Sequence, residues 1–237
     1  MACFVKIKIL SCEDFSDARK AFGRATPEYW RLFANLFVGA GAAMADIEVF
    51  DARNGELPAV RFGEKYVITG SLSSAYDSDA WISALKDFVR AACGCGAKVV
   101  GICFGHQLVA DALGGRVARA EAGWGEGIRF SPLKSDFLKP YFPDGGFWLD
   151  YNHHDQVIEL PPNAERLSGS EFCPNESYRI GESALCFQGH PEFTREYSDM
   201  LFSYFKNEFP QPVQIARENA KNKPTDSAKI AKAIMQF

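Results

Sequence analysis

The stretch from Val99 to Gly115, VVGICFGHQLVADALGG, constrains the fold more than any other part of the chain. An apolar, mostly β-branched run ends in front of a turn, and the residues from Gly105 onward have a helical pattern. A strand that passes directly into a helix is half of a crossover unit, and crossover units build parallel sheets. The turn itself holds Cys103, which has a glycine two residues away on each side.

Strand and helix patterns alternate through the first half of the chain, whereas the second half contains short strand-like pieces divided by Gly, Pro and Asn. The predicted strands are 4–10, 47–50, 66–69, 98–102, 116–119, 127–130, 147–151, 164–170 and 184–188. The predicted helices are 16–38, 79–93 (with Asp79 as the N-cap), 105–113, 195–207 and a helical tail at about 211–237 that breaks at Pro224. This order predicts an α/β fold with an open, mostly parallel, twisted sheet and helices on both faces. We expect a single domain over residues 1–237.

Composition excludes several classes of partner. The chain has 237 residues, of which 47% are hydrophobic, and a net charge of −4 without a basic face. We therefore expect no nucleic-acid partner and no membrane association, and the apolar runs are far too short to span a bilayer. The seven cysteines show no disulfide spacing and no secretory signal precedes them. This pattern predicts reduced thiols and a cytoplasmic location.

The position of Cys103 predicts a nucleophile. Ligands bind beyond the carboxyl ends of parallel strands, and Cys103 lies at such an end. The G-x-C-x-G spelling fits a nucleophile elbow, in which glycines relieve the crowding around a sharp turn. The N-terminus of the following helix favours the thiolate, and the Phe104 N–H is free to bind an oxyanion. The alternative is a structural cysteine buried at a glycine-rich turn.

A base for this nucleophile is predicted in the segment CFQGHPEF. His190 follows another apolar run, so it also falls at the carboxyl end of a strand. Glu192 is two residues further, and residues i and i+2 of an extended chain point to the same side. The carboxylate is therefore expected to reach Nδ1 of His190 and to leave Nε2 for the sulfur, while Pro191 fixes φ between the two.

The segments GICFGHQ and GHPEF together resemble the class I glutamine amidotransferase family, triad type, as in the glutaminase domain of GMP synthetase. A third segment, YNHHDQV, looks like the loop that the family has between these motifs, and the resemblance extends from about residue 66 to 193. It implies a flavodoxin-like amidotransferase fold, with Cys103 as nucleophile, His190 as general base and acid, and Glu192 as the residue that orients it. It implies no metal or other cofactor.

The resemblance also implies a substrate site. The oxyanion would be held by Phe104 N–H and a backbone N–H near Gly70 and Ser71, where family members usually have two glycines and this chain has TGS. The residues that would hold the glutamyl part are Gln107, Asn152, His154 and Asp155. The roles of His153 and His154 stay open, because one of them is equally well explained as a packed side chain.

The resemblance implies hydrolysis of a γ-glutamyl amide, with glutamine cleaved to glutamate and ammonia through a thioester. The sequence contains no phosphate loop and no nucleotide loop of a synthetase, so a separate synthetase chain would receive the ammonia, or none is transferred. The alternative is a stand-alone γ-glutamyl peptidase, and a further one is a non-catalytic regulatory subunit on the same fold.

Three other patterns carry weaker signals. Gly39-Ala40-Gly41 lacks the strand that precedes a dinucleotide-binding loop, so we reject that function. Cys93 and Cys95 lack metal-site spacing and are expected to be ordinary thiols at a helix end. Trp124 and Glu126, in a glycine-rich segment, are candidates either for the pocket wall or for a structural turn.

Overall fold

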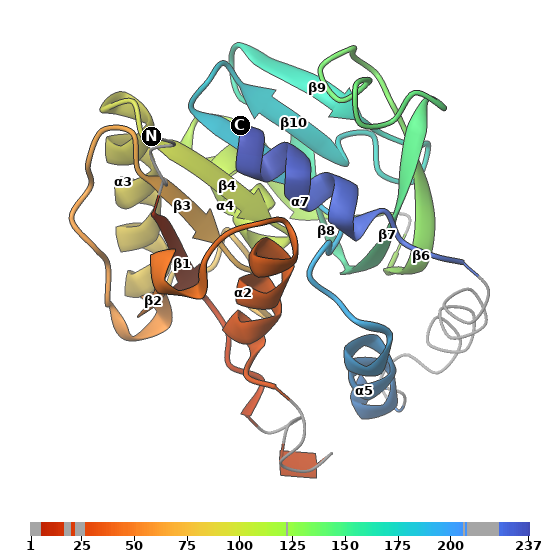
Figure 1. Ribbon diagram of the computed structural model, residues 1–237, viewed down its shortest axis with the longest axis horizontal. Helices are drawn as coiled ribbons and strands as arrows, with labels where there is room; N and C mark the ends of the chain where they lie inside the picture. The colour runs from red at the N-terminus through yellow and green to blue at the C-terminus, as the bar shows by residue number, and fades with distance from the viewer. Residues whose placement is uncertain (1–5, 17–19, 22–26, 122, 206, 208–222) are drawn as a thin grey trace.

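A seven-stranded sheet forms the centre of the molecule in the computed structural model, which describes residues 6–16, 20–21, 27–121, 123–205, 207 and 223–237 (Figure 1). The strands of this sheet, in spatial order, are β2 (Ile47–Asp51), β1 (Ile7–Ser11), β3 (Lys65–Ile68), β4 (Lys98–Ile102), β11 (Ala184–Phe187), β10 (Ser177–Ile180) and β9 (Ala164–Ser168). The strands from β2 to β11 are parallel to their neighbours, and β10 and β9 extend the sheet in antiparallel fashion. The prediction of an open, mostly parallel sheet is confirmed.

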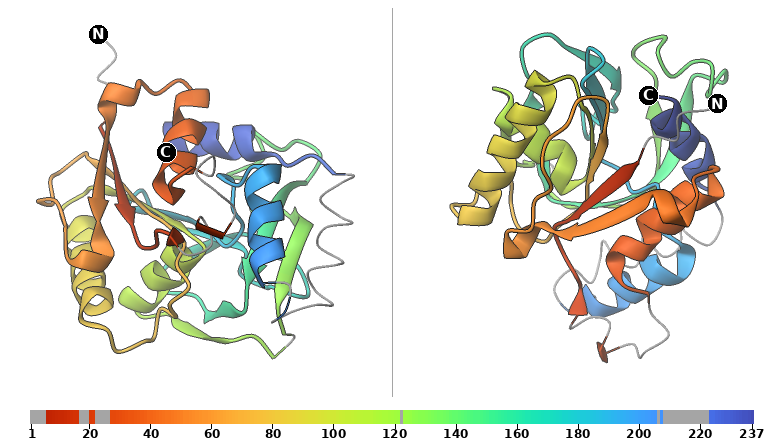
Figure 2. Two further views of the ribbon diagram at one scale, coloured as in Figure 1. Left: turned by 90° about the horizontal axis from the view of Figure 1, so that it is seen from below. Right: turned by 60° about the vertical axis from the view of Figure 1, so that its left-hand side comes forward.

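Helices cover both faces of this sheet (Figure 2). The helices are α2 (Tyr29–Gly39), α3 (Ala80–Gly94), α4 (Phe104–Ala112), α5 (Arg195–Phe205) and α7 (Ser227–Gln236), with short 3₁₀ turns at Met44–Asp46 and Ala52–Asn54. Apolar residues of β3 alternate between two hydrophobic clusters: Val67 packs with α2 and α7, whereas Tyr66 and Ile68 pack with α3 and α4. A strand with both faces buried is apolar throughout, as its sequence KYVI nearly is.

Two antiparallel strand pairs accompany the main sheet. One is β5 (Arg116–Arg119) with β8 (Asp155–Glu159), and the other is β6 (Gly125–Pro132) with β7 (Gly146–His153). The sequence did not predict β8 or β10. Both are short and polar at their start, and their strand conformation depends on pairing with distant segments that no local pattern announces.

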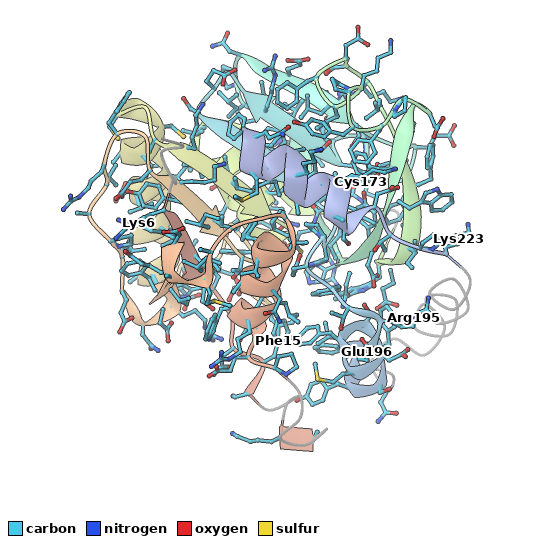
Figure 3. All side chains as sticks on the ribbon, in the orientation of Figure 1. Lys6, Phe15, Cys173, Arg195, Glu196 and Lys223 are labelled. Atoms are coloured by element: carbon cyan, nitrogen blue, oxygen red, sulfur yellow. The ribbon has the colours of Figure 1, made fainter. Side chains whose placement is uncertain are left out.

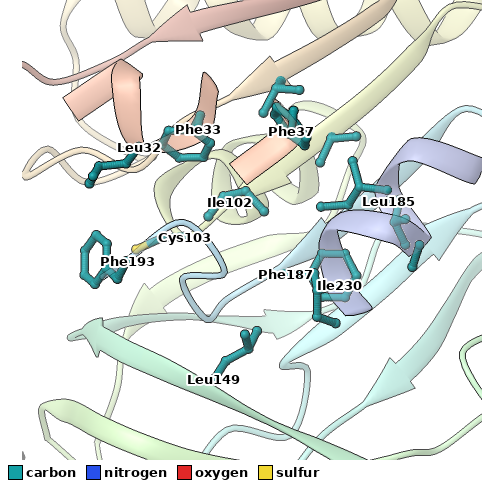
Figure 4. Packing of buried hydrophobic residues seen from close by; sticks show 14 of the residues in the cluster. Leu32, Phe33, Phe37, Ile102, Cys103, Leu149, Leu185, Phe187, Phe193 and Ile230 are labelled. Atoms are coloured by element: carbon teal, nitrogen blue, oxygen red, sulfur yellow. The ribbon is translucent and has the colours of Figure 1, made fainter. Parts of the chain in front are cut away.

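The part of the predicted helical tail that the structure describes is a packed element. Helix α7 lies against α2 and buries Ile230 and Ile234 in the cluster on that face (Figure 4). At one end, Asp226 N–H donates to the Trp148 carbonyl and the Asp226 carboxylate accepts from Trp148 N–H at 2.9 Å. At the other end, Lys65 Nζ donates to the Ile234 carbonyl at 2.6 Å. The first part of the predicted tail, 211–222, lies outside the described residues.

Two helix starts differ from the predictions. Helix α2 begins at Tyr29, and parts of the predicted stretch before it lie outside the described residues. Asp79 occupies the N-cap position of α3, as expected, but its side chain makes no capping hydrogen bond. Among the described helices, none is long and apolar enough to cross a membrane.

Candidate active site

Cys103 lies at a strained turn between β4 and α4. Its φ is 53° and its ψ is −104°, a conformation that is uncommon for a residue with a side chain. The flanking glycines are required by close backbone contacts, because a Cβ at Gly101 would lie 2.5 Å from the Gly105 carbonyl oxygen. A Cβ at Gly105 would lie 2.3 Å from the Ile68 carbonyl oxygen. The spacing of glycines around Cys103 therefore has the steric cause that the sequence predicts.

His190 and Glu192 form a buried pair beyond the end of β11. His190 Nδ1 lies 2.7 Å from Glu192 Oε1, and both side chains are almost completely buried. The imidazole stacks on the Phe193 ring with centroids 4.0 Å apart and planes inclined by 8°. His190 N–H also donates to the Asp150 carbonyl at 2.7 Å, which holds the backbone of the pair against β7. The predicted approach of the carboxylate to Nδ1 is present.

The electrostatics of His190 favour its protonated form. Burial works to lower its pKa, but the Glu192 carboxylate and the neighbouring Cys103 together hold that pKa well above the usual value. Within the described part of the chain, His190 Nε2 is buried and has no other hydrogen-bond partner. The imidazolium therefore has one nitrogen committed to Glu192 and the other available on the Cys103 side.

Tyr29 is a member of this cluster that sequence reasoning missed. Its hydroxyl donates to Glu192 Oε1 at 2.9 Å, the same oxygen that lies against His190 Nδ1. Tyr29 is fully buried in α2, packed against Phe15 and Phe193. It lies far before His190 in the sequence, and nothing in its local pattern separates it from an ordinary core tyrosine.

A pocket of about 330 Å³ opens above Cys103. Its floor contains Cys103, Gly70 and His190, and Phe193 lies beside the Cys103 sulfur in Figure 4. One wall is apolar and includes Phe15, which contacts both Tyr29 and Tyr197 and so lies between α2 and α5 (Figure 3). Such a largely apolar pocket with a few convergent polar groups is typical of a small-molecule site.

Gly70 and Ser71, the predicted oxyanion loop, line this pocket. A Cβ at Gly70 would lie 2.6 Å from the Tyr29 hydroxyl and 3.3 Å from His190 Cε1, so a larger residue would disturb both. Thr69, which stands where the family usually has another glycine, accepts from Cys12 N–H at 2.9 Å and donates to the Gly70 carbonyl at 3.0 Å. This departure from the family pattern therefore anchors the loop to the end of β1.

The predicted oxyanion donor next to the nucleophile lies in the first turn of α4. Phe104 is the first residue of that helix, and N–H groups of a first helical turn have no acceptor within their own helix. Its ring is buried in the α3–α4 cluster, so only its backbone faces the turn at Cys103.

The remaining predicted binding residues form one network on the opposite side of the pocket. Gln107 Nε2 donates to the Asp155 carbonyl at 2.9 Å, and Cys103 Sγ lies 3.9 Å from the Asn152 carbonyl oxygen. The Asp155 carboxylate binds His154 Nδ1 at 2.8 Å. Asn152 Oδ1 accepts from Trp124 Nε1 at 3.0 Å. Many of these polar groups thus hold one another and shape the wall.

The two adjacent histidines occupy different environments. His153 is buried with Nδ1 2.9 Å from the Asp155 carbonyl, and burial lowers its pKa to about 3. His154 is partly exposed and packs on the Trp124 ring with centroids 4.7 Å apart. The arrangement of one packed and one exposed histidine matches the structural alternative, although both side chains line the pocket.

The other candidate patterns are resolved by position. Trp124 lines the pocket, whereas Glu126 is buried opposite Asn152 in the β6–β7 pair and does not line it. Cys93 and Cys95 lie at the end of α3, and the six cysteines that the structure describes are all free. The described residues contain no group of three or more side chains that could hold a metal ion.

Comparisons with known proteins agree with this geometry. The family model for glutamine amidotransferase class-I matches residues 63–209. Gamma-glutamyl peptidase 4 from Arabidopsis thaliana is 36% identical over 201 residues, which cover 81% of this chain and 76% of that protein. The glutamine-hydrolyzing subunit of GMP synthase from Haloarcula marismortui is 36% identical over 111 residues, which cover 45% of this chain and 58% of that protein.

Solved structures show the same fold. A glutamine amidotransferase from Thermotoga maritima superimposes with a TM-score of 0.73 at 20% identity, covering 98% of this chain and 95% of that one. A glutamine amidotransferase from Methylobacillus flagellatus superimposes with a TM-score of 0.74 at 18% identity, covering 98% and 93%. With the family model spanning more than half of its residues, this chain belongs to the class-I glutamine amidotransferase family.

Proposed function

We propose that this protein is a γ-glutamyl peptidase, which hydrolyses the γ-glutamyl amide bond of small peptides with Cys103 as nucleophile. The observation that carries the proposal is the geometry at the pocket floor. A cysteine held at a strained strand–helix turn lies beside a buried imidazole whose other nitrogen is 2.7 Å from a carboxylate. This is the arrangement of nucleophile, base and orienting group that acyl transfer through a covalent intermediate requires.

In the first half of the reaction, the Cys103 thiolate attacks the γ-carbonyl carbon of the substrate. The C–N bond then breaks, His190 gives its Nε2 proton to the departing amine, and a γ-glutamyl thioester remains on the sulfur. In the second half, His190 takes a proton from water, the resulting hydroxide attacks the thioester carbon, and glutamate leaves as the thiolate is restored. Glu192 keeps the imidazole in the orientation that both halves need.

The negative charge that develops on the carbonyl oxygen needs fixed donors. We assign this role to the Phe104 N–H, at the start of α4, and to a backbone N–H of the loop at Gly70 and Ser71. The bonds of Thr69 to Cys12 and Gly70 support this assignment, because they fix the loop before substrate arrives. The residues proposed to hold the glutamyl group, on the opposite wall, are Gln107, Asn152, His154 and Asp155.

Two observations favour a peptide over glutamine as the substrate. The relatives named gamma-glutamyl peptidases match along 70–77% of their length, whereas the GMP synthase relative matches along 58% of its length. In addition, the pocket continues past His190 along an apolar wall of Phe15, Leu72, Leu201 and Phe205. The histidine protonates the departing amine, so that amine leaves on this side, where there is room for more than ammonia.

The test is glutamate release from purified protein, with glutathione and glutamine supplied side by side. A higher kcat/KM for glutathione supports the peptidase. A higher kcat/KM for glutamine, with ammonia formed, would instead favour a glutaminase that serves a separate synthetase. Release from neither substrate would contradict both enzymatic functions and leave the non-catalytic, regulatory role.

Substitution of the three proposed catalytic residues should give a graded loss of activity. We expect Cys103→Ala to abolish turnover, because no thioester can form, and His190→Ala to cost more than Glu192→Gln, since an orienting group is less essential than the base. Steady-state kinetics on glutathione, with circular dichroism to verify folding, provide the measurement. Turnover by folded Cys103→Ala above a trace would disprove the covalent mechanism, and equal losses for the other two would give Glu192 a different role.

A further inference from the structure

Arg119 is the one Arg or Lys among the described residues that line the pocket. It is exposed, and within the described ranges its guanidinium makes no hydrogen bond and no ion pair. By contrast, Arg116 on the same strand is paired with Glu159 at 2.6 Å. An arginine left unpaired at the wall of a largely apolar pocket is available to bind an anionic group of the ligand.

The strand that carries Arg119 directs it toward the pocket. Arg119 is the last residue of β5, and Val117, two residues earlier, is buried against α4 in the α3–α4 cluster. Side chains at i and i+2 point to the same side of a strand. Arg119 therefore faces the side on which α4 lies, near Gln107 and opposite its register partner Asp155.

The neighbouring carboxylate does not neutralise this arginine. The Asp155 carboxylate accepts from Ser74 Oγ at 2.6 Å and from Tyr76 OH at 3.0 Å, and it binds His154 Nδ1 at 2.8 Å. These bonds occupy both of its oxygens and hold it away from ion pairing with Arg119. The positive charge of the guanidinium thus remains directed at the pocket.

The two sides of the pocket have different chemical roles. The His190 ring packs against Phe193 and near Tyr29, in the cluster on the α2–α7 face of the sheet. Arg119 and Gln107 lie on the α4 face, with Cys103 between the two groups. Because the amine departs on the histidine side, the acyl chain of the substrate extends from the sulfur toward the α4 side, where Arg119 lies.

We propose that Arg119 binds the α-carboxylate of the γ-glutamyl group and thereby selects γ-glutamyl compounds over other amides. This inference rests on the proposed function. A guanidinium offers two parallel N–H donors to a carboxylate, which gives both affinity and orientation. It would fix the far end of the acyl chain while Cys103 attacks the near end, so that only an acyl chain of γ-glutamyl length with an α-carboxylate binds productively.

The test compares γ-glutamylglycine with 4-aminobutyrylglycine, which has the same amide and the same leaving group but lacks the α-carboxylate. The wild-type protein, Arg119→Met and Arg119→Lys are assayed for glycine release. We expect Arg119→Met to reduce the preference for γ-glutamylglycine, as a ratio of kcat/KM values, by about 10- to 100-fold, because a hydrogen-bonded charge pair is lost. Arg119→Lys should retain part of the preference, since it keeps the charge without the fork.

Arg116→Met is the matched control, because it removes an arginine from the same strand but from outside the pocket, and its preference should equal that of the wild type. An equal loss on both substrates in Arg119→Met would overturn the inference, since Arg119 would then bind the leaving group's carboxylate or act structurally. An unchanged ratio would overturn it as well. Failure of the wild type to cleave γ-glutamylglycine would instead contradict the proposed function.

Discussion

At the scale of single residues, the candidate site depends on a few atoms whose freedom has been removed. Glu192 Oε1 lies 2.7 Å from His190 Nδ1 and 2.9 Å from the Tyr29 hydroxyl, so one oxygen serves two partners. Gly70 allows this cluster to form, because any Cβ there would press on Tyr29 and His190. Tyr29 is thus placed to act through Glu192, and we regard it as a positioning residue.

Tyr29→Phe should change the pH dependence of catalysis as well as its rate. Without the hydroxyl, Glu192 is less neutralised and attracts a proton on His190 more strongly, so the pKa of His190 rises further. We expect kcat to fall by about 10-fold, the scale of one hydrogen bond to a charged group, and the alkaline limb of the kcat/KM profile to move to higher pH. Kinetics on glutathione across the acid and alkaline limbs of the profile provide the measurement.

Tyr178→Phe serves as the control, because its hydroxyl donates to the His106 carbonyl at 2.6 Å in the other cluster and has no contact with the pair. It should lower thermal stability and leave the pH profile unchanged. If Tyr29→Phe behaved in the same way, Tyr29 would be a core residue without a positioning role.

At the scale of elements, strand ends bring the site together and helices hold those ends in place. The loop after β3, the turn after β4 and the segment after β11 meet at one edge of the sheet, as parallel order requires. Helix α7 lies on the face that also carries Tyr29 and Phe193, and it is bonded at both ends through Asp226 and Lys65. It therefore contributes to the core that supports the His190 side of the pocket.

Ile234→Ala tests the contribution of α7 to stability. Ile234 is completely buried against that core, so the substitution removes apolar contacts and leaves a cavity. The free energy of unfolding should fall by about 2–5 kcal/mol in urea titrations. Lys232→Ala, at an exposed position of the same helix, should change it by less than about 0.5 kcal/mol. Equal effects of the two substitutions would mean that α7 is not part of the cooperative core.

At the scale of the whole molecule, the burial of neutral histidines makes folding sensitive to acid. Burial lowers the pKa of both His106 and His153 to about 3, from 6.5 in a solvated chain. Between these two pKa values, the unfolded chain therefore binds protons at these positions that the folded protein does not. Each contributes stability that is lost as the pH falls through this window, at up to about 1.4 kcal/mol per pH unit.

His106→Gln isolates one of these two protons, because a glutamine amide can still donate to the Asn175 carbonyl, which lies 2.9 Å from His106 Nε2. Urea titrations of the wild type and the variant at about pH 6 and about pH 4, on either side of most of that proton uptake, should show a shallower loss of stability in the variant. The comparison cancels the opposite contribution of Glu126, whose pKa burial raises to about 7 in both proteins. Parallel losses in the two proteins would show that His106 is not buried in its neutral form.

The sequence by itself determined the features that depend on neighbouring residues. The strand–turn–helix at Cys103 and the i, i+2 approach of Glu192 to His190 follow from glycine sterics and extended-chain geometry, which act over a few residues. The alternation of strands and helices likewise predicted the parallel part of the sheet, because crossover connections leave few other arrangements.

Only the tertiary structure decided what depends on segments far apart in the chain. Tyr29 contacts Glu192 across 163 positions, and Arg119 reaches the pocket because β5 pairs with β8. Strands β8 and β10 exist for the same reason, since their polar starts form strand only where distant partners accept their hydrogen bonds. Such contacts arise from the packing of the whole chain, and a local pattern contains no record of them.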